Sequence, residues 1–149
     1  MKLTGARVFD ASAAQIWELL MNADTLAKIT PGISRLDPTG PDTYKAIADV
    51  KIGPVSGSFS GKVALMDKEA PHRFTLRVEQ NSKIGNVAAD IALELVEIDA
   101  GKTEMRFDGL AQLSGLLART GQRVLSGVAN TLTEQFFKAL EAELQTPPA

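Results

Sequence analysis

The chain has 149 residues, of which 44% are hydrophobic and 23% are charged, with a formal net charge of −2. This composition is that of an ordinary globular protein, and the length predicts one domain with one core. The even charge balance excludes the broad basic field with which nucleic-acid-binding proteins displace counterions from phosphates. Cysteine is absent, which excludes disulfides, thiolate metal ligands and a cysteine nucleophile.

No secretion signal or membrane-spanning segment is evident. The first ten residues lack a basic start followed by an apolar run. No stretch approaches the roughly 20 apolar residues that span a bilayer. We therefore expect a cytoplasmic protein whose contact with a membrane, at its inner face, is at most peripheral.

The N-terminal segment predicts one strand and two short helices. Residues 2–10 are compatible with a strand, and Gln15 follows Ser12 by three positions, which is the capping-box pattern of a helix start. A second short helix is predicted over residues 24–30, because Pro31-Gly32 then ends it.

Residues 33–113 show a hydrophobic period of two, which predicts six strands. Turn residues recur about every ten to fifteen positions, as in an antiparallel meander. Each strand then has one buried and one exposed face. Gly57 and Gly61 fall within one of these strands and are either ordinary strand glycines or the site of a bulge or a bend that helps the sheet curl around the helix.

The helical period returns after residue 115, and no proline occurs before Pro147, so one helix of about 30 residues is predicted. Such a helix would be about 45 Å long, too long for two short helices to cover. We therefore predict an α+β fold of the helix-grip type. A curved antiparallel sheet of about seven strands surrounds the long C-terminal helix in a single domain over residues 1–145, followed by a frayed tail over 146–149.

Two glycines, Gly121 and Gly127, fall in the first half of this helix. Each should cost about 1 kcal/mol relative to alanine. Two explanations remain open: close packing of the helix on the sheet, or room left for a ligand between them.

Several strings along the chain are similar to those of one known family. They are Met1-Lys2-Leu3-Thr4-Gly5, Trp17-Glu18-Leu19-Leu20, Thr30-Pro31-Gly32, Gly40-Pro41-Asp42-Thr43-Tyr44, Gly53-Pro54-Val55-Ser56-Gly57-Ser58-Phe59-Ser60-Gly61-Lys62-Val63 and Glu134-Gln135-Phe136-Phe137. Together with the order of the elements, these strings resemble the CoxG-like family of carbon monoxide dehydrogenase subunits. The resemblance covers nearly the whole chain. This family lies within the START-like, Bet v 1-like (SRPBCC) helix-grip superfamily.

The resemblance implies a carrier or adaptor for a molybdenum hydroxylase of the carbon monoxide dehydrogenase type. Such a protein would take an isoprenoid quinone of the menaquinone type, or another lipid, from the bilayer by transient contact and present it to the enzyme. No covalent cofactor is implied. The segment from Gln80 to Asn86 departs from the glycine-rich stretch common in the family, so its contacts are expected to differ.

We expect an apolar small molecule to lie between the sheet and the first half of the long helix, with a closed end near Phe136. The expected lining consists of inward-facing residues of the strands and helices. These residues are Trp17, Leu26, Ile29, Phe59, Val63, Phe74, Val78, Gln80, Phe107, Ala111, Leu113, Leu117, Gly121, Val124, Val128 and Leu132. Ordinary core packing is the alternative interpretation for each of them.

Polar groups in this lining are few. Gln80 and Ser82 continue the inward register of the strand containing Phe74, so they could bond a quinone carbonyl or another polar head group, unless the loop turns into solvent. Arg7 faces either water or the cavity. The only histidine, His72, stands between Pro71 and Arg73 at a strand entrance, where we expect it in solvent.

Catalytic and metal sites are not predicted. Glu94 and Glu97 differ by an odd number in a strand and so point to opposite faces. One histidine without cysteine does not make a zinc site. Three functions remain: a carrier of an apolar ligand, a docking or maturation factor with a filled interior, and an enzyme of the cyclase or dehydratase type. The third needs polar catalytic groups in the cavity, and the expected lining has few.

Overall fold

The computed structural model describes residues 1–145, so the predicted frayed tail, 146–149, lies outside the described residues. The elements in chain order are β1 (Lys2–Phe9), α1 (Ala13–Met21), α2 (Ala23–Ile29), β2 (Ile33–Gly40), β3 (Thr43–Ile52), β4 (Val55–Glu69), β5 (Arg73–Ser82), β6 (Gly85–Asp99), β7 (Lys102–Leu113), α3 (Leu116–Arg119) and α4 (Gln122–Gln145).

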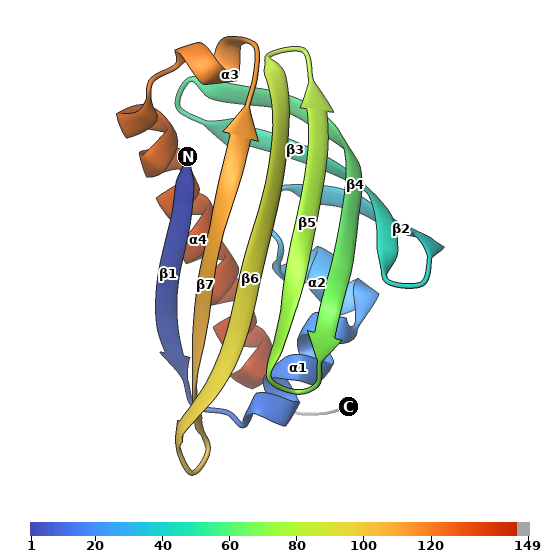
Figure 1. The fold of residues 1–149 in the computed structure, drawn as a ribbon, viewed down its shortest axis with the longest axis vertical. Helices are drawn as coiled ribbons and strands as arrows, with labels where there is room; N and C mark the ends of the chain where they lie inside the picture. Colours follow the sequence, from blue (N-terminus) through green and yellow to red (C-terminus); the bar gives the residue numbers. More distant parts are fainter. Residues whose placement is uncertain (146–149) are drawn as a thin grey trace.

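The seven strands form one sheet in the order β1-β7-β6-β5-β4-β3-β2, and every neighbouring pair is antiparallel. Strands β2 to β7 are a simple meander, and the N-terminal strand returns to pair with β7. The sheet curves, and α4 runs along its inner side (Figure 1). The predicted α+β helix-grip arrangement, with two short helices after the first strand, is confirmed.

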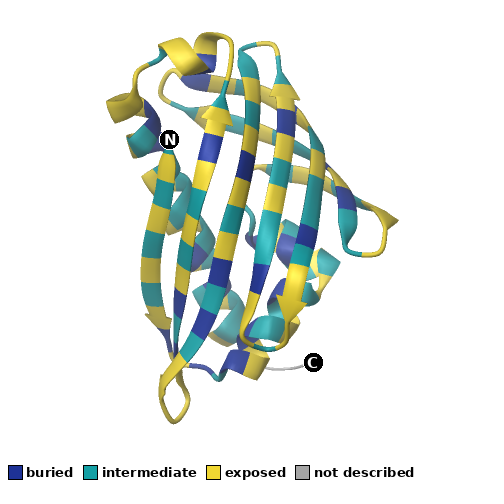
Figure 2. Cartoon of the chain, in the orientation of Figure 1, coloured by how far each residue is buried: buried dark blue, intermediate teal, exposed yellow. Residues whose placement is uncertain are grey.

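Burial alternates along the strands, as the period of two predicts (Figure 2). In β1 the odd-numbered residues from Leu3 to Phe9 face inward. Arg7 therefore faces the helix: its guanidinium lies 3.3 Å from Glu134 Oε1 and 3.0 Å from Glu141 Oε2, both on α4. Arg7 ties β1 to α4 and does not line the cavity.

Two apolar clusters hold the sheet and the helices together. The larger, at the α1 end, includes Phe9, Ile16, Met105 and Leu140, each at most 2% exposed. The smaller, at the α3 end, consists of Val55, Phe59, Leu117, Leu125 and Val128. The sheet and α4 are thus packed together at both ends.

The local signals at the two short helices are confirmed. Ser12 Oγ accepts the Gln15 backbone N–H at 3.2 Å, and the Gln15 side chain accepts the Ser12 N–H at 2.9 Å, which completes the capping box. Helix α2 ends at Ile29, and Thr30 is its C-cap.

The long C-terminal helix is shorter than predicted. The chain forms the short α3, breaks at Thr120 and Gly121, and begins α4 at Gln122. Gly121 has φ +100°, a conformation that favours glycine, so it is a helix break and not an interior position. The 24 residues of α4 span about 36 Å.

Gly57 and Gly61 interrupt neither neighbouring ladder where they are paired, so neither marks a bulge. At Gly61 an added Cβ would lie 1.9 Å from the Glu79 carbonyl oxygen. Strand β4 curves strongly across the sheet (Figure 1). Gly61 therefore permits a close approach of β4 to β5 within the bent sheet. This agrees with the expectation of a bend and not with that of a bulge.

We expect Gly61→Ala to lower the free energy of unfolding by about 1–3 kcal/mol, because β4 or β5 must shift to admit the methyl group. Gly57→Ala is the matched control, since its nearest neighbour is the Ile84 side chain at 3.9 Å. Urea denaturation of both variants checks this. Equal midpoints for the two variants would contradict it.

Gly127 on α4 has open space around its Cβ position and is exposed, so neither close packing nor ligand room explains it. We expect Gly127→Ala to raise the free energy of unfolding by about 1 kcal/mol through helix propensity. Gly121→Ala should instead lower it, because φ is positive there. Thermal melting of the two variants separates these outcomes.

Candidate ligand-binding cavity

A cavity of about 390 Å³ lies between the inner face of the sheet and the helices. Within residues 1–145, each of the seven strands and four helices contributes at least one lining residue. This volume falls in the lower part of the roughly 300–1,000 Å³ range of small-molecule sites. The inner face of the sheet and the helices therefore enclose a hollow beside the two packed clusters.

Most of the residues that the sequence assigned to the site line this cavity. They are Leu26, Phe59, Val63, Phe74, Val78, Gln80, Ala111, Leu113, Leu117, Val128 and Leu132. Phe136 on α4 also lines it, and the adjacent Phe137 packs into the larger cluster. The cavity thus lies beside the part of the C-terminal segment that was expected.

The expected lining was wrong at Val124 and Gly121. Val124 is 40% exposed, whereas the next residue, Leu125, lines the cavity. The break at Gly121 is the reason: Val124 follows Leu117 by two turns in an unbroken helix, but α4 restarts with a new phase at Gln122. Gly121 itself is exposed and lines nothing.

Trp17, Ile29 and Phe107 belong to the packed interior and not to the cavity wall. The Trp17 ring meets the Phe74 ring edge-on at 5.7 Å, so Trp17 packs behind a lining residue. Ile29 is 1% exposed within the larger cluster. The Phe107 ring covers Gly5 and lies 6.0 Å from the Phe137 ring.

The structure adds lining residues from the buried faces of strands, which the expected site did not include. Those of β3 and β6 are Ala46, Ala48, Val50, Val87, Ala89, Ile91 and Leu93. Their alternation with outward residues was a usable signal. For the lining residues of β1 and β2, such as Leu3 and Ile33, the sequence offered no comparable indication. These strands form the two edges of the sheet, and their positions follow from its topology.

Only two polar side chains occur among the described lining residues, Thr30 and Gln80. The Thr30 hydroxyl donates to the Leu26 carbonyl at 2.6 Å and is satisfied. Gln80 is 8% exposed; its Nε2 donates to the Glu79 carbonyl at 3.1 Å, while its Oε1 has no partner. Ser82 does not reach the cavity, because its hydroxyl holds the turn by donating to the Gly85 carbonyl at 2.6 Å.

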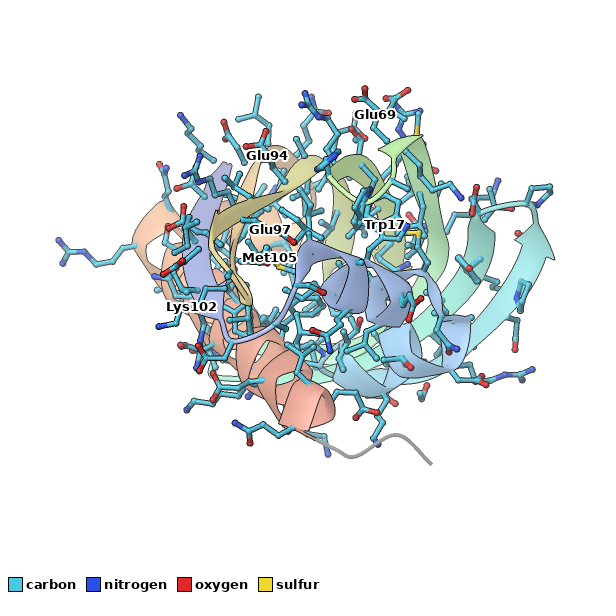
Figure 3. All side chains as sticks on the ribbon, turned by 90° about the horizontal axis from the view of Figure 1, so that it is seen from below. Trp17, Glu69, Glu94, Glu97, Lys102 and Met105 are labelled. Carbon is cyan, nitrogen blue, oxygen red and sulfur yellow. The ribbon has the colours of Figure 1, made fainter. Side chains whose placement is uncertain are left out.

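Titratable side chains lie outside the described cavity wall. His72 is exposed in a turn, as expected. Glu97 is also exposed and accepts the Ala13 backbone N–H at the start of α1. Figure 3 shows Glu69 and Glu94 at the periphery of the lower end and Trp17 between α1 and the sheet. Within residues 1–145, no three carboxylate or imidazole groups gather into a metal site.

Shifts in pKa occur in ion pairs on the outer face of the sheet. Hydrogen bonding to Arg77, whose Nε lies 2.9 Å from Asp90 Oδ1, lowers the pKa of Asp90 and raises that of Arg77. A hydrogen bond to Glu104 likewise raises the pKa of Arg106. These exposed pairs supply no acid or base to the cavity.

Comparison with solved structures supports the same architecture. A conserved protein from Geobacillus kaustophilus is 29% identical with a TM-score of 0.93, covering 96% of this chain and 94% of that chain. A START superfamily protein from Mycobacterium smegmatis is 16% identical with a TM-score of 0.74, covering 95% of each chain. The Zhui aromatase/cyclase from Streptomyces sp. R1128 is 14% identical with a TM-score of 0.69, covering 96% and 92%. The last two show the START-like fold alone.

Family assignment rests on a sequence model. No curated protein matches the chain. The model of the family described as CoxG, a subunit of carbon monoxide dehydrogenase, matches residues 5–145. Membership and fold together favour a hydrophobic ligand-binding or accessory role. Because the match spans nearly the whole chain, this protein belongs to the CoxG family of carbon monoxide dehydrogenase subunits.

Proposed function

We propose that this protein is a non-catalytic carrier of an apolar small molecule, an isoprenoid quinone, for a molybdenum hydroxylase of the carbon monoxide dehydrogenase type. The apolar cavity of about 390 Å³ carries the proposal. Protein interiors are normally close-packed, and an unfilled hollow forfeits contacts and stability. A ligand that fills the hollow restores those contacts.

A quinone suits this lining because it combines a flat apolar ring, two carbonyls and a hydrocarbon tail. The wall is aliphatic and aromatic, with Gln80 as the one lining side chain with an unpaired polar atom among the described residues. Such a wall binds hydrocarbon strongly and fixes a head group by few contacts. The volume accommodates a head group with part of its tail.

The two alternative functions fit the interior less well. A docking or maturation factor that binds no ligand has no need of a hollow, and filling it with larger side chains would stabilise the fold. A cyclase or dehydratase needs general acids and bases within reach of its substrate, and the described lining offers no titratable side chain. Family membership supports the dehydrogenase as partner.

Ala89, in the wall on β6, provides a direct test. We expect Ala89→Phe to weaken binding of a short-chain menaquinone at least about tenfold, because its ring occupies ligand space. Ala88→Phe is the matched control, since Ala88 is exposed on the opposite face. Quenching of Trp17 fluorescence in titrations measures both affinities. Undetectable binding to the wild-type protein, or equal affinities of the two variants, would count against a cavity-bound quinone.

Transient contact with the inner face of a membrane, as part of this proposal, is supported by an uneven distribution of charge. No helix within residues 1–145 has the length and apolar content to cross a bilayer. The α3 end of the molecule, called here the cationic end, comprises residues 1–3, 50–57, 80–88 and 112–125. It carries five exposed basic residues and no Asp or Glu: Lys2, Lys51, Lys83, Arg119 and Arg123.

Apolar side chains protrude at the same end. Leu116 is 59% exposed and Val124 is 40% exposed. The Leu117 N–H donates to the Ile84 carbonyl at 2.9 Å, which joins two of these segments, and Val55, Leu117 and Leu125 pack together and line the cavity. None of the five basic residues forms an ion pair within the described chain. A surface of unpaired cations with protruding apolar groups suits anionic lipid.

We expect the triple variant Lys83→Gln/Arg119→Gln/Arg123→Gln to bind vesicles containing phosphatidylglycerol roughly 100-fold more weakly, at about 1 kcal/mol per basic residue. Lys45→Gln/Lys62→Gln/Lys138→Gln removes equal charge elsewhere and is the control. Vesicle sedimentation at low salt provides the measurement. Equal losses for both variants would mean that only net charge matters.

A further inference from the structure

We propose that Gln80 Oε1 selects ligands carrying a hydrogen-bond donor, namely a hydroxyl on an apolar ring or chain, over ligands that only accept. This inference rests on the proposed function of the cavity as an apolar ligand site. For a quinone ligand, it means that the reduced form, the hydroquinone, binds more tightly than the oxidised form.

The orientation of the Gln80 amide is set by the backbone. The Glu79 carbonyl oxygen lies 3.1 Å from Nε2 and can only accept, so the nitrogen must face it. Oε1 is thereby the atom left over. It is the only buried side-chain nitrogen or oxygen within residues 1–145 that lacks a partner.

The neighbours of Gln80 offer this oxygen no donor. Across the ladders, Gln80 stands opposite Gly61 on β4 and Val87 on β6. Gly61 has no side chain, and Val87 is apolar and lines the cavity. The other polar side chain in the described wall, Thr30, already donates to the Leu26 carbonyl. A donor must therefore come from a molecule bound in the cavity that Gln80 lines, and the amide must turn toward that molecule, because Oε1 itself is buried.

An unpaired buried acceptor lowers folding stability, and an apolar side chain of similar size would avoid this cost. A bound hydroxyl removes the cost by donating to Oε1. Quinone carbonyls only accept. Addition of two electrons and two protons converts both carbonyls to hydroxyls, so the hydroquinone supplies the missing donor. By linkage, a tenfold preference makes the bound quinone about 30 mV easier to reduce.

Three air-stable probes of one ring system test the selection: 2-naphthol, which donates; 2-methoxynaphthalene, which only accepts; and naphthalene, which has no polar atom. Calorimetry gives Kd for each with the wild type, Gln80→Met and Gln80→Leu. Gln112→Met is the matched control, because Gln112 is exposed on the outer face of β7. Methionine keeps the length of glutamine but offers only a weakly accepting sulfur.

We expect the wild type and Gln112→Met to favour 2-naphthol over 2-methoxynaphthalene by about tenfold. Both Gln80 variants should lose this preference, bind naphthalene at least as tightly as the wild type, and melt at a higher temperature without ligand. Retention of the preference in both Gln80 variants would overturn the selection, while naphthalene binding would leave the carrier function standing. If none of the three probes binds the wild type, the result contradicts both the proposed carrier function and the selection by Gln80.

Discussion

The distance at which α4 is held from the middle strands is the constraint on which the hollow interior depends. The backbone of α4 comes close chiefly to α2 and β1. At one end the Phe137 ring lies 5.8 Å from Phe9 and 6.0 Å from Phe107, and these rings act as a spacer. At the other end Leu125 and Val128 pack with Val55 and Phe59. Further bending of the sheet into the gap would strain its ladder hydrogen bonds, which are costly to leave unmade.

The fold was predictable because the local sequence pattern of each strand and short helix agrees with the element that forms there. The period of two located the six meander strands, and Ser12 with Gln15 located the start of α1. The phase of the C-terminal helix was missed because it depends on a single positive φ at Gly121. From the sequence alone Gly121 looks like an ordinary glycine inside a helix, because the end of α3 just before it is not evident.

The candidate site was predictable only in part, because alternation separates inward from outward residues but does not say whether an inward residue meets space or another side chain. Phe74 and Phe107 both face inward, yet only Phe74 lines the cavity. The Phe107 ring instead occupies the space beside Gly5, where a side chain would otherwise lie, and Gly5 belongs to a distant part of the chain. Likewise the inward register predicted Gln80, but its unpaired oxygen follows from the position of the Glu79 carbonyl.

Gln80 and the cavity reduce the stability of the folded chain in the same region and in ways that a ligand can offset. The uneven distribution of charge concerns the same region. Although the net charge is −2, the cationic end beside the cavity wall contains no Asp or Glu. Native mass spectrometry of the protein purified gently from cells that make isoprenoid quinones would show directly whether the cavity holds a quinone. We expect one bound lipid per chain, identified as a quinone by fragmentation and absent from Ala89→Phe. A wild-type protein that carries no lipid, and takes none up from quinone-containing vesicles, would contradict it.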